Sequence, residues 1–294
     1  MRKLASVMCL VVLFSGISSA QATPIEQATT GSINLTSVNS KYKSCSYPKG
    51  PSVVRPPNAV SWEAQGFGDV IRGIDVSRWN HPNNKAIDFA KIKAEHKITF
   101  VIIKSSDGGS TGNALAKKWY AIDRKAALAQ GLVVGGYHYA LPGNLSSNRT
   151  QDAKLQAARA VRQADGAKVG DLPLTLDMEE LPCGWTHKQL AQWTDVFLKE
   201  AKRLTGRTPI IYMNGTFIKR LVEANVTDFS VYPLWVAKWG PKLGTDPGQL
   251  SVWPGKWTIW QFTADGKVNG VSSKSTDLNI FNGNGADFQA FISR

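Results

Sequence analysis

From Ile71 to the end of the chain, short apolar runs alternate with longer stretches of helical periodicity. Five apolar runs are each followed by such a stretch, and they read IRGIDVS, FVIIKSS, LVVGGYHYA, LPLTLDME and PIIYMN. Three further runs, PLWVAKW, WTIWQFT and TDLNIF, follow with little helical pattern between them. Apolar runs that alternate with helices are typical of strands in a parallel sheet covered on both faces. The pattern therefore predicts an α/β fold with helices outside the sheet.

The number of strands narrows this fold class further. About eight strands in roughly 220 residues fit a closed barrel better than an open doubly wound sheet. Because the last three runs lack intervening helices, we predict an irregular TIM-like barrel, (β/α)5(β)3, over residues 69–294. The chain shows no internal repeat. The DGGS segment at Asp107 follows a strand but has neither glycine-rich phosphate-binding spacing.

The first 22 residues have the pattern of a secretory signal peptide. A basic start is followed by an apolar stretch from Leu4 to Ile17 and by an A-x-A cleavage site near Ala22. We expect a secreted or periplasmic protein without a stable membrane anchor, because no later run of about 18 apolar residues occurs. An uncleaved anchor is the alternative. Residues 23–68 are rich in Ser, Thr, Asn and Pro and predict an extension that packs little core.

Cysteine content and net charge agree with export. Cleavage would remove Cys9 and leave Cys45 and Cys183, which an exported chain usually pairs. We expect this disulfide to tether the extension beside the fourth strand, with two separate thiols as the alternative. Loss of Arg2 and Lys3 would lower the net charge from +13 to +11. A basic exported protein is drawn to anionic surfaces, and we expect an envelope polymer as partner, no nucleic acid, and a monomer.

Acidic residues stand where several predicted strands end. The fourth strand runs into PLTLDMEE, and acids also follow the first strand and lie in the eighth. Function gathers at the C-terminal strand ends of a parallel barrel. We therefore expect these acids to lie together at one end of the barrel. The four candidates are Asp75, Asp177, Glu179 and Asp277.

The spacing within the fourth strand is informative about chemistry. Because strand side chains alternate, Asp177 and Glu179 should point the same way, roughly 6–7 Å apart along the strand. Glu180 falls on the other face and is expected to begin the loop. Two carboxylates this close in a cleft cannot both ionise easily, so one pKa should rise. An acid and a base made from two such groups are what glycosidic bond cleavage requires.

Aromatic residues add to this interpretation. The chain has 10 Trp, and flat rings stack on sugar faces. Tryptophans in or near strand ends are Trp79, Trp235, Trp239, Trp257 and Trp260. We expect Trp119 and Trp193 to pack in the core or helix layer. His138 is either a buried, hydrogen-bonded histidine or a cleft residue.

Taken in order, eight segments resemble the motifs of glycoside hydrolase family 25. They are GIDVSRWN, FVIIKSSDG, GGYHYA, LTLDMEE, PIIYMNG, LWVAKW, WTIWQFT and STDLNIFNG. The family contains the Chalaropsis-type lysozymes, which are N-acetylmuramidases with an irregular barrel. The resemblance implies cleavage of the β-1,4 bond between N-acetylmuramic acid and N-acetylglucosamine in peptidoglycan glycan strands, without a metal or other cofactor.

Matching positions carry the family's roles onto this chain. Glu179 corresponds to the general acid and Asp177 to its partner carboxylate, while Asp75 and Asp277 line the catalytic subsite. The positions that match the sugar groove are Tyr137, Tyr139, Tyr212, Trp235 and Gln261, and Lys104 at a strand end is a further substrate-binding candidate. Asp107 stands where the family more often has Glu. The extension lies outside the resemblance, and no C-terminal wall-binding repeat is seen.

Two other functions compete with this one. Asp75, Glu179, Asp277 and His138 could ligate a divalent cation in a barrel phosphodiesterase. A catalytically inactive peptidoglycan-binding protein could keep the groove without the chemistry. The sequence leaves the biological role open between wall remodelling, antibacterial attack, nutrition and phage release.

Overall fold

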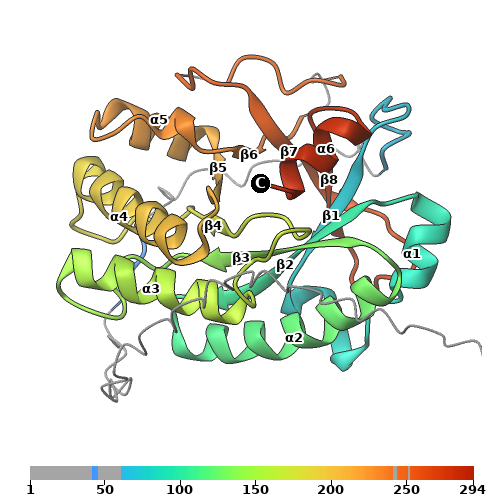
Figure 1. Cartoon of the computed structure of the whole chain (residues 1–294), viewed down its shortest axis with the longest axis horizontal. Helices are drawn as coiled ribbons and strands as arrows, with labels where there is room; N and C mark the ends of the chain where they lie inside the picture. Colours follow the sequence, from blue (N-terminus) through green and yellow to red (C-terminus); the bar gives the residue numbers. More distant parts are fainter. Residues whose placement is uncertain (1–41, 46–60, 241–243, 251) are drawn as a thin grey trace, which may run out of the picture. The chain divides into compact units, whose positions relative to one another are not determined.

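The computed structural model describes residues 42–45, 61–240, 244–250 and 252–294 of the chain (Figure 1). The expected signal peptide and most of the expected extension lie outside these residues. Within the described part, no helix is long and apolar enough to cross a membrane.

Eight strands among the described residues close into a barrel in chain order. They are β1 (Arg72–Val76), β2 (Phe100–Asp107), β3 (Val133–Tyr139), β4 (Thr175–Asp177), β5 (Ile210–Asn214), β6 (Leu234–Ala237), β7 (Trp257–Gly266) and β8 (Thr276–Phe281). Neighbours from β1 to β7 are parallel, whereas β8 is antiparallel to both β7 and β1. The predicted irregular TIM-like barrel is confirmed.

Helices follow each of the first five strands and lie around the outside of the barrel (Figure 1). They are α1 (Phe89–His96), α2 (Ser110–Ala129), α3 (Arg149–Gln163), α4 (His187–Thr205) and α5 (Gly215–Glu223). The described residues also form three short 3-10 helices, η1 (Arg78–Asn80), η2 (Pro82–Asn84) and η3 (Phe229–Val231). The described residues between β6 and β7, and between β7 and β8, contain no helix. An antiparallel connection such as β7 to β8 can be short, because it needs no crossover.

Local sequence explains where α4 begins and ends. At the start of α4, the Thr186 side chain accepts the Gln189 backbone N–H and Gln189 bonds back, which is a capping box. The helix ends at Gly206, whose φ of 70° suits glycine. Between these ends, Leu190, Trp193 and Phe197 are buried at helical spacing. This face packs the helix onto the outside of the barrel.

A last helix, α6 (Gly285–Ile292), closes the end of the barrel opposite to the acidic strand ends. Its Phe288 is buried and contacts Phe100 and Phe281, with ring centroids 5.7 and 5.1 Å apart. Phe100 begins β2, and Phe281 ends the antiparallel β8, so both rings lie where the parallel strands begin. The other end of the barrel is left for a site.

The expectation that residues 23–68 pack little core is wrong for the last of them. Trp62 is completely buried, and its indole N–H donates to the Asn279 carbonyl at 3.0 Å. Phe67 packs edge-to-face against Trp260 and Phe262, at centroid distances of 5.7 and 4.9 Å. Two aromatic residues in a polar stretch have no periodicity, so the polar composition concealed them. The folded unit therefore begins before residue 69.

Candidate active site

Three of the four predicted acids lie on strands at one end of the barrel. Asp75 is near the end of β1, and Asp177 is the last residue of β4. Asp277 was predicted at the end of the eighth strand, but it is the second residue of β8. Because β8 is antiparallel, its beginning lies at the mouth, and Asp277 pairs directly with Asp75 in the strand register. The predicted gathering of these acids is therefore present.

Asp75 is held by two amide side chains. Its Oδ2 accepts from Gln261 Nε2 at 2.9 Å and from Asn279 Nδ2 at 2.8 Å. The amides are oriented in turn, because Tyr212 donates to Gln261 Oε1 at 3.0 Å and Trp235 donates to Asn279 Oδ1 at 2.8 Å. Each amide must therefore present its NH2 group to the carboxylate. Burial nevertheless raises the pKa of Asp75.

Asp177 and Glu179 form the centre of the group. The strand ends at Asp177, yet the Met178 N–H still donates to the Tyr212 carbonyl at 3.0 Å. Met178 is fully buried, while Asp177 is 5% exposed and hydrogen-bonds with Glu179. The predicted same-side placement of the two carboxyls is confirmed by this hydrogen bond. The buried Oδ1 of Asp177 has no hydrogen-bond partner among the described residues.

Burial is the largest cause of the raised pKa of both acids. Burial, together with the charges of Glu180 and Asp75, raises the pKa of Glu179 to about 6. The hydrogen bond from Asp177 lowers the Glu179 pKa and so offsets part of this rise. Burial and the Glu179 charge hold the pKa of Asp177 well above its usual value. The Lys104 charge lowers both values. A buried pair with this mutual influence retains a proton that a solvated pair would lose.

A second polar chain borders the pair. The Lys104 ammonium contacts Asp107 Oδ2 at 2.6 Å and lies 4.2 Å from the centroid of the Tyr139 ring. The Tyr139 hydroxyl donates to Glu180 Oε1 at 2.6 Å. Glu180 was expected to face away from the site. Because β4 ends at Asp177, strand alternation no longer applies to Glu180, and its carboxylate turns toward Tyr139.

Aromatic rings line the barrel mouth beside the acids. Trp235 packs edge-on against Tyr212 and Tyr137, with centroids 4.5 and 6.3 Å apart. Burial, with the charge of Asp177 as the next cause, raises the pKa of Tyr137, so this hydroxyl stays neutral. Trp260 is fully buried and bonds the Lys238 carbonyl at 2.7 Å. It therefore packs in the core and offers no sugar platform.

The other tryptophans divide between surface and interior. Trp79 is 73% exposed and Trp239 is 43% exposed, whereas Trp257 is half-buried against Trp260. Trp119 and Trp193 are buried, as predicted. Only the exposed rings offer a free face to a ligand.

His138 is a structural histidine. It is completely buried, with Nδ1 2.8 Å from Ser106 Oγ and Nε2 2.9 Å from Gln156 Oε1. Burial lowers its pKa to about 4. Both ring nitrogens are used, so His138 does not join the acids in a cation site. Among the described residues, no group of three or more His, Cys, Asp or Glu has a metal-binding arrangement.

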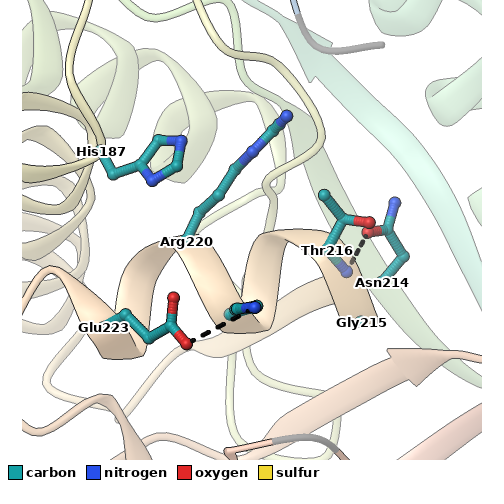
Figure 2. Close-up of a pocket in the computed structure, with 7 residues that line it drawn as sticks. His187, Asn214, Gly215, Thr216, Arg220 and Glu223 are labelled. Carbon is teal, nitrogen blue, oxygen red and sulfur yellow. Dashed lines mark hydrogen bonds and ion pairs between the residues drawn. The ribbon is translucent and has the colours of Figure 1, made fainter. Parts of the chain in front are cut away.

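A hollow of about 580 Å³ lies at the beginning of α5 (Figure 2). It is lined by His187, Asn214, Gly215, Thr216, Lys219, Arg220 and Glu223. Asn214 caps the helix by accepting the Thr216 N–H at 3.0 Å, and Lys219 pairs with Glu223 at 3.8 Å. None of the four acids lines this hollow. It borders the strand that carries Tyr212 and is separate from the acidic group.

The predicted disulfide between Cys45 and Cys183 is present, with Cα atoms 4.9 Å apart. It ties a piece of the N-terminal extension to the loop that follows Glu179 and Glu180. A disulfide that closes a long loop is typical of proteins in oxidising compartments.

Comparison with known proteins decides the family. Residues 74–271 match the model of glycosyl hydrolases family 25. The chain belongs to this family. It is therefore a glycoside hydrolase, and its acidic group lies where family 25 motifs were identified in the sequence.

Named relatives of this family 25 hydrolase include both characterised and uncharacterised proteins. It is 29% identical over 229 residues to the uncharacterised protein YegX of Escherichia coli (strain K12), covering 76% of this chain and 73% of that one. It is 28% identical to Lysozyme M1 of Streptomyces globisporus, over 76% and 71% of the two chains. The solved bacterial lysozyme from Streptomyces coelicolor has 27% identity and a TM-score of 0.62, over 77% of this chain and 99% of that one.

Asn279 belongs to this family 25 site but was not among the residues predicted from the sequence. The TDLNIF run places Asp277, Asn279 and Phe281 at alternate positions, so all three face the barrel interior. The position of Asn279 between Asp277 and Phe281 on the inward face of the strand could have indicated that its amide lies near the acids. The Tyr139–Glu180 contact had no such signal, because it depends on how the chain leaves β4.

Proposed function

We propose that this family 25 hydrolase is an exported lysozyme. Its reaction would be hydrolysis of the β-1,4 bond between N-acetylmuramic acid and N-acetylglucosamine in peptidoglycan. The observation that carries the proposal is the buried, hydrogen-bonded pair Asp177–Glu179, whose raised pKa values keep a proton available near neutral pH. Similarity to Lysozyme M1 and to the Streptomyces coelicolor lysozyme supports the substrate class.

Glu179 acts as the general acid. The proton held by the pair passes to the Glu179 carboxyl through its hydrogen bond with Asp177. Glu179 donates this proton to the glycosidic oxygen while the bond from that oxygen to the muramic acid C1 breaks. The bonding electron pair leaves with the oxygen, and positive charge develops on the ring carbon. Water then adds to C1 and returns a proton to the Glu179 carboxylate, which acts now as a base.

Asp177 acts when positive charge has developed on the ring carbon. Once its proton has moved to Glu179, its carboxylate either orients the substrate N-acetyl oxygen for attack on C1 or stabilises the cation directly. Asp75 and Asp277 add negative character beside the pair, and Asp75 is fixed by Gln261 and Asn279. Tyr137 and Tyr139, which are partly exposed, would border the sugar, and Lys104 would contact its polar groups. Tyr212, Trp235 and Gln261 are buried and would form the floor of the sugar site, where they orient the groups around Asp75.

Export and substrate attraction complete the proposal. A Cys45–Cys183 disulfide fits folding outside the cytoplasm, and the predicted signal peptide would supply the route. The net charge, +13 for the full chain and +11 once Arg2 and Lys3 are removed, would draw the protein toward an anionic wall. Amino-terminal sequencing of protein recovered from the periplasm or medium tests this part. A mature chain that begins near residue 23 is expected, and a cytoplasmic chain that begins at Met1 would contradict it.

The decisive experiment is mass spectrometry of products from purified peptidoglycan, digested in EDTA by the wild type and by Glu179→Gln. Fragments with reducible N-acetylmuramic acid ends, absent with the variant, are expected. Reducing ends at glucosamine would overturn the bond specificity. Activity that EDTA abolishes would favour a metal-dependent phosphodiesterase. Binding to the wall without cleavage would favour a catalytically inactive peptidoglycan-binding protein.

A further inference from the structure

A short piece of the N-terminal extension is fastened beside the proposed general acid. We call residues 42–45 the strap. Ser44 forms an antiparallel bridge with Pro182, the Cys45 N–H donates to the Leu181 carbonyl at 2.7 Å, and the Cys183 N–H donates to the Lys43 carbonyl at 3.0 Å. The Cys45–Cys183 disulfide joins two positions that are 138 residues apart in sequence. The strap is therefore held to residues 181–183 by backbone pairing and by a covalent bond.

The strap holds the loop that carries two carboxylates of the site. On one side of Glu179 and Glu180, the Met178 N–H is bonded to the Tyr212 carbonyl of the barrel. On the other side, Leu181 is bonded to the strap. The two glutamates therefore lie between two fixed points only three residues apart. Of these fixed points, only the strap can be released without a change in the barrel.

Tyr42 is the first residue of the strap. Its hydroxyl oxygen is buried and has no hydrogen-bond partner among the described residues. Burial raises the pKa of Tyr42, and the charge of Glu180 is the next cause, followed by Asp152 and Asp107. The Tyr42 hydroxyl is therefore within electrostatic range of Glu180, whose carboxylate accepts a hydrogen bond from Tyr139.

We propose that the strap is a positioning element of the active site, which holds Glu180 beside Glu179 and so keeps the general acid protonated. The inference rests on the proposed role of Glu179. It assigns a role in positioning the active site to four residues of the N-terminal extension.

The electrostatic surroundings of Glu179 identify what the strap can change. The charged groups that act on Glu179 are Asp177 on β4, Asp75 on β1, Lys104 on β2 and Glu180 on the loop. The tyrosines that face it are Tyr137 and Tyr139 on β3 and Tyr212 on β5. All of them except Glu180 lie on barrel strands, which the strap does not hold.

Release of the strap therefore changes two influences on Glu179, and both have the same sign. A mobile loop moves the Glu180 charge away and lets water reach Glu179. Both the Glu180 charge and burial raise the Glu179 pKa, so their loss lowers it. The general acid then loses its proton at a lower pH.

The test measures the alkaline limb of the kcat/KM profile for peptidoglycan in wild type, Cys45→Ser and Glu180→Gln. Cys45→Ser is expected to move this limb to lower pH by about one unit, since a nearby charge in a partly buried site shifts a pKa by that order. Glu180→Gln, which keeps the acceptor for Tyr139, is expected to shift it in the same direction. The shift caused by Glu180→Gln should largely disappear in the Cys45→Ser background, because release of the strap has already moved the Glu180 charge away.

Controls separate positioning from stability. Ile292→Ala removes a buried side chain from α6, at the opposite end of the barrel, and should lower the melting temperature without moving the limb. Cys45 and Cys183 are exposed, so reduction and alkylation of the folded wild type provide a second route if Cys45→Ser folds poorly. An unmoved limb after strap release, an equal shift in Ile292→Ala, or fully additive shifts would each overturn the proposal.

A second readout does not depend on activity. Protein labelled with ¹³C in the glutamate carboxyl groups allows the Glu179 pKa to be followed by NMR, with Glu179→Gln to assign the signal. If the wild type fails to cleave peptidoglycan, the proposed function fails, but this titration still decides whether the strap acts on Glu179. A Glu179 pKa that is the same before and after reduction would refute the inference.

Discussion

Asp152 and Asp177 are both buried carboxylates, but their surroundings are opposite in kind. Asp152 is completely buried at the start of α3 and accepts five hydrogen bonds. They come from the backbone N–H groups of Gly143, Leu145 and Ser146 at 2.7, 2.6 and 3.0 Å, from Gln156 at 2.9 Å and from Trp193 at 2.7 Å. Asp177 is 5% exposed, lies beside a second carboxyl, and has one oxygen without a hydrogen-bond partner among the described residues.

The difference distinguishes the structural acid Asp152 from Asp177, the acid that we propose takes part in the reaction. A carboxylate whose lone pairs are all used holds a loop and two helices together, and has nothing left for a substrate. An unsatisfied carboxylate next to a like charge is costly to bury, so its persistence indicates a function. Burial raises the pKa of both aspartates, so the pKa direction alone would not distinguish them. The hydrogen bonds that each carboxylate accepts do distinguish the two aspartates.

The largest expected effect is the loss of activity when Glu179, the hydrogen-bond partner of Asp177, is replaced. Glu179→Gln keeps the shape of the side chain and removes the proton donor, so kcat/KM should fall by about 10²- to 10⁴-fold. The free energy of unfolding should stay the same or rise, because one of two repelling acids is gone. Steady-state hydrolysis and urea denaturation of the same preparation measure both. Activity near that of wild type would remove Glu179 from its role.

Asp152→Ala should show the reverse pattern. It leaves five donors without their acceptor, and the free energy of unfolding should fall by about 3 kcal/mol, given the cost of unmet buried hydrogen bonds. The folded fraction, assayed well below its melting temperature, should keep kcat within a few-fold of wild type. Trp193→Phe, which removes one of the five donors, is the matched milder variant. A large loss of kcat in the folded protein would mean that Asp152 belongs to the active site.

The acidic strand ends were predictable, because their signals are local. Apolar runs indicated the strands, and the spacing of Asp177 and Glu179 placed both carboxyls on one side. Residues that hold the acids were harder to foresee, because Gln261 and Asn279 reach Asp75 across 186 and 204 residues of sequence. The antiparallel direction of β8 and the burial of Trp62 also depend on contacts that only the closed barrel creates.

Stability should depend on pH through Glu179. Its pKa rises from 4.5 in the reference state to about 6 in the fold, so the folded state binds the proton more tightly. The stabilisation is present below pH 4.5 and is lost as pH rises through 6, which amounts to about 2 kcal/mol. His138 acts in the opposite direction, since its lowered pKa costs stability as pH falls below its usual value.

The difference in unfolding free energy between wild type and Glu179→Gln reports on Glu179 alone, because His138 is present in both proteins. Urea midpoints should be measured for both proteins from pH 4 to pH 8. The variant should have the higher midpoint at high pH, and this advantage should disappear as the pH falls. A difference that does not change with pH would mean that the Glu179 pKa is not raised by the fold.

The smallest expected effect concerns Lys104. Its ammonium lowers the pKa of both Asp177 and Glu179, and it also contacts Asp107. Lys104→Met should therefore move the alkaline limb of kcat/KM to higher pH by a few tenths of a unit, since the cation is partly neutralised by Asp107. This sign is opposite to that expected for Glu180→Gln, so the two variants together test whether charge around Glu179 controls the limb. If both variants move the limb in the same direction, general disturbance of the site explains the change better than electrostatics. A rise in KM without any movement of the limb would mean that Lys104 contributes through its contact with the substrate alone and not through the Glu179 pKa.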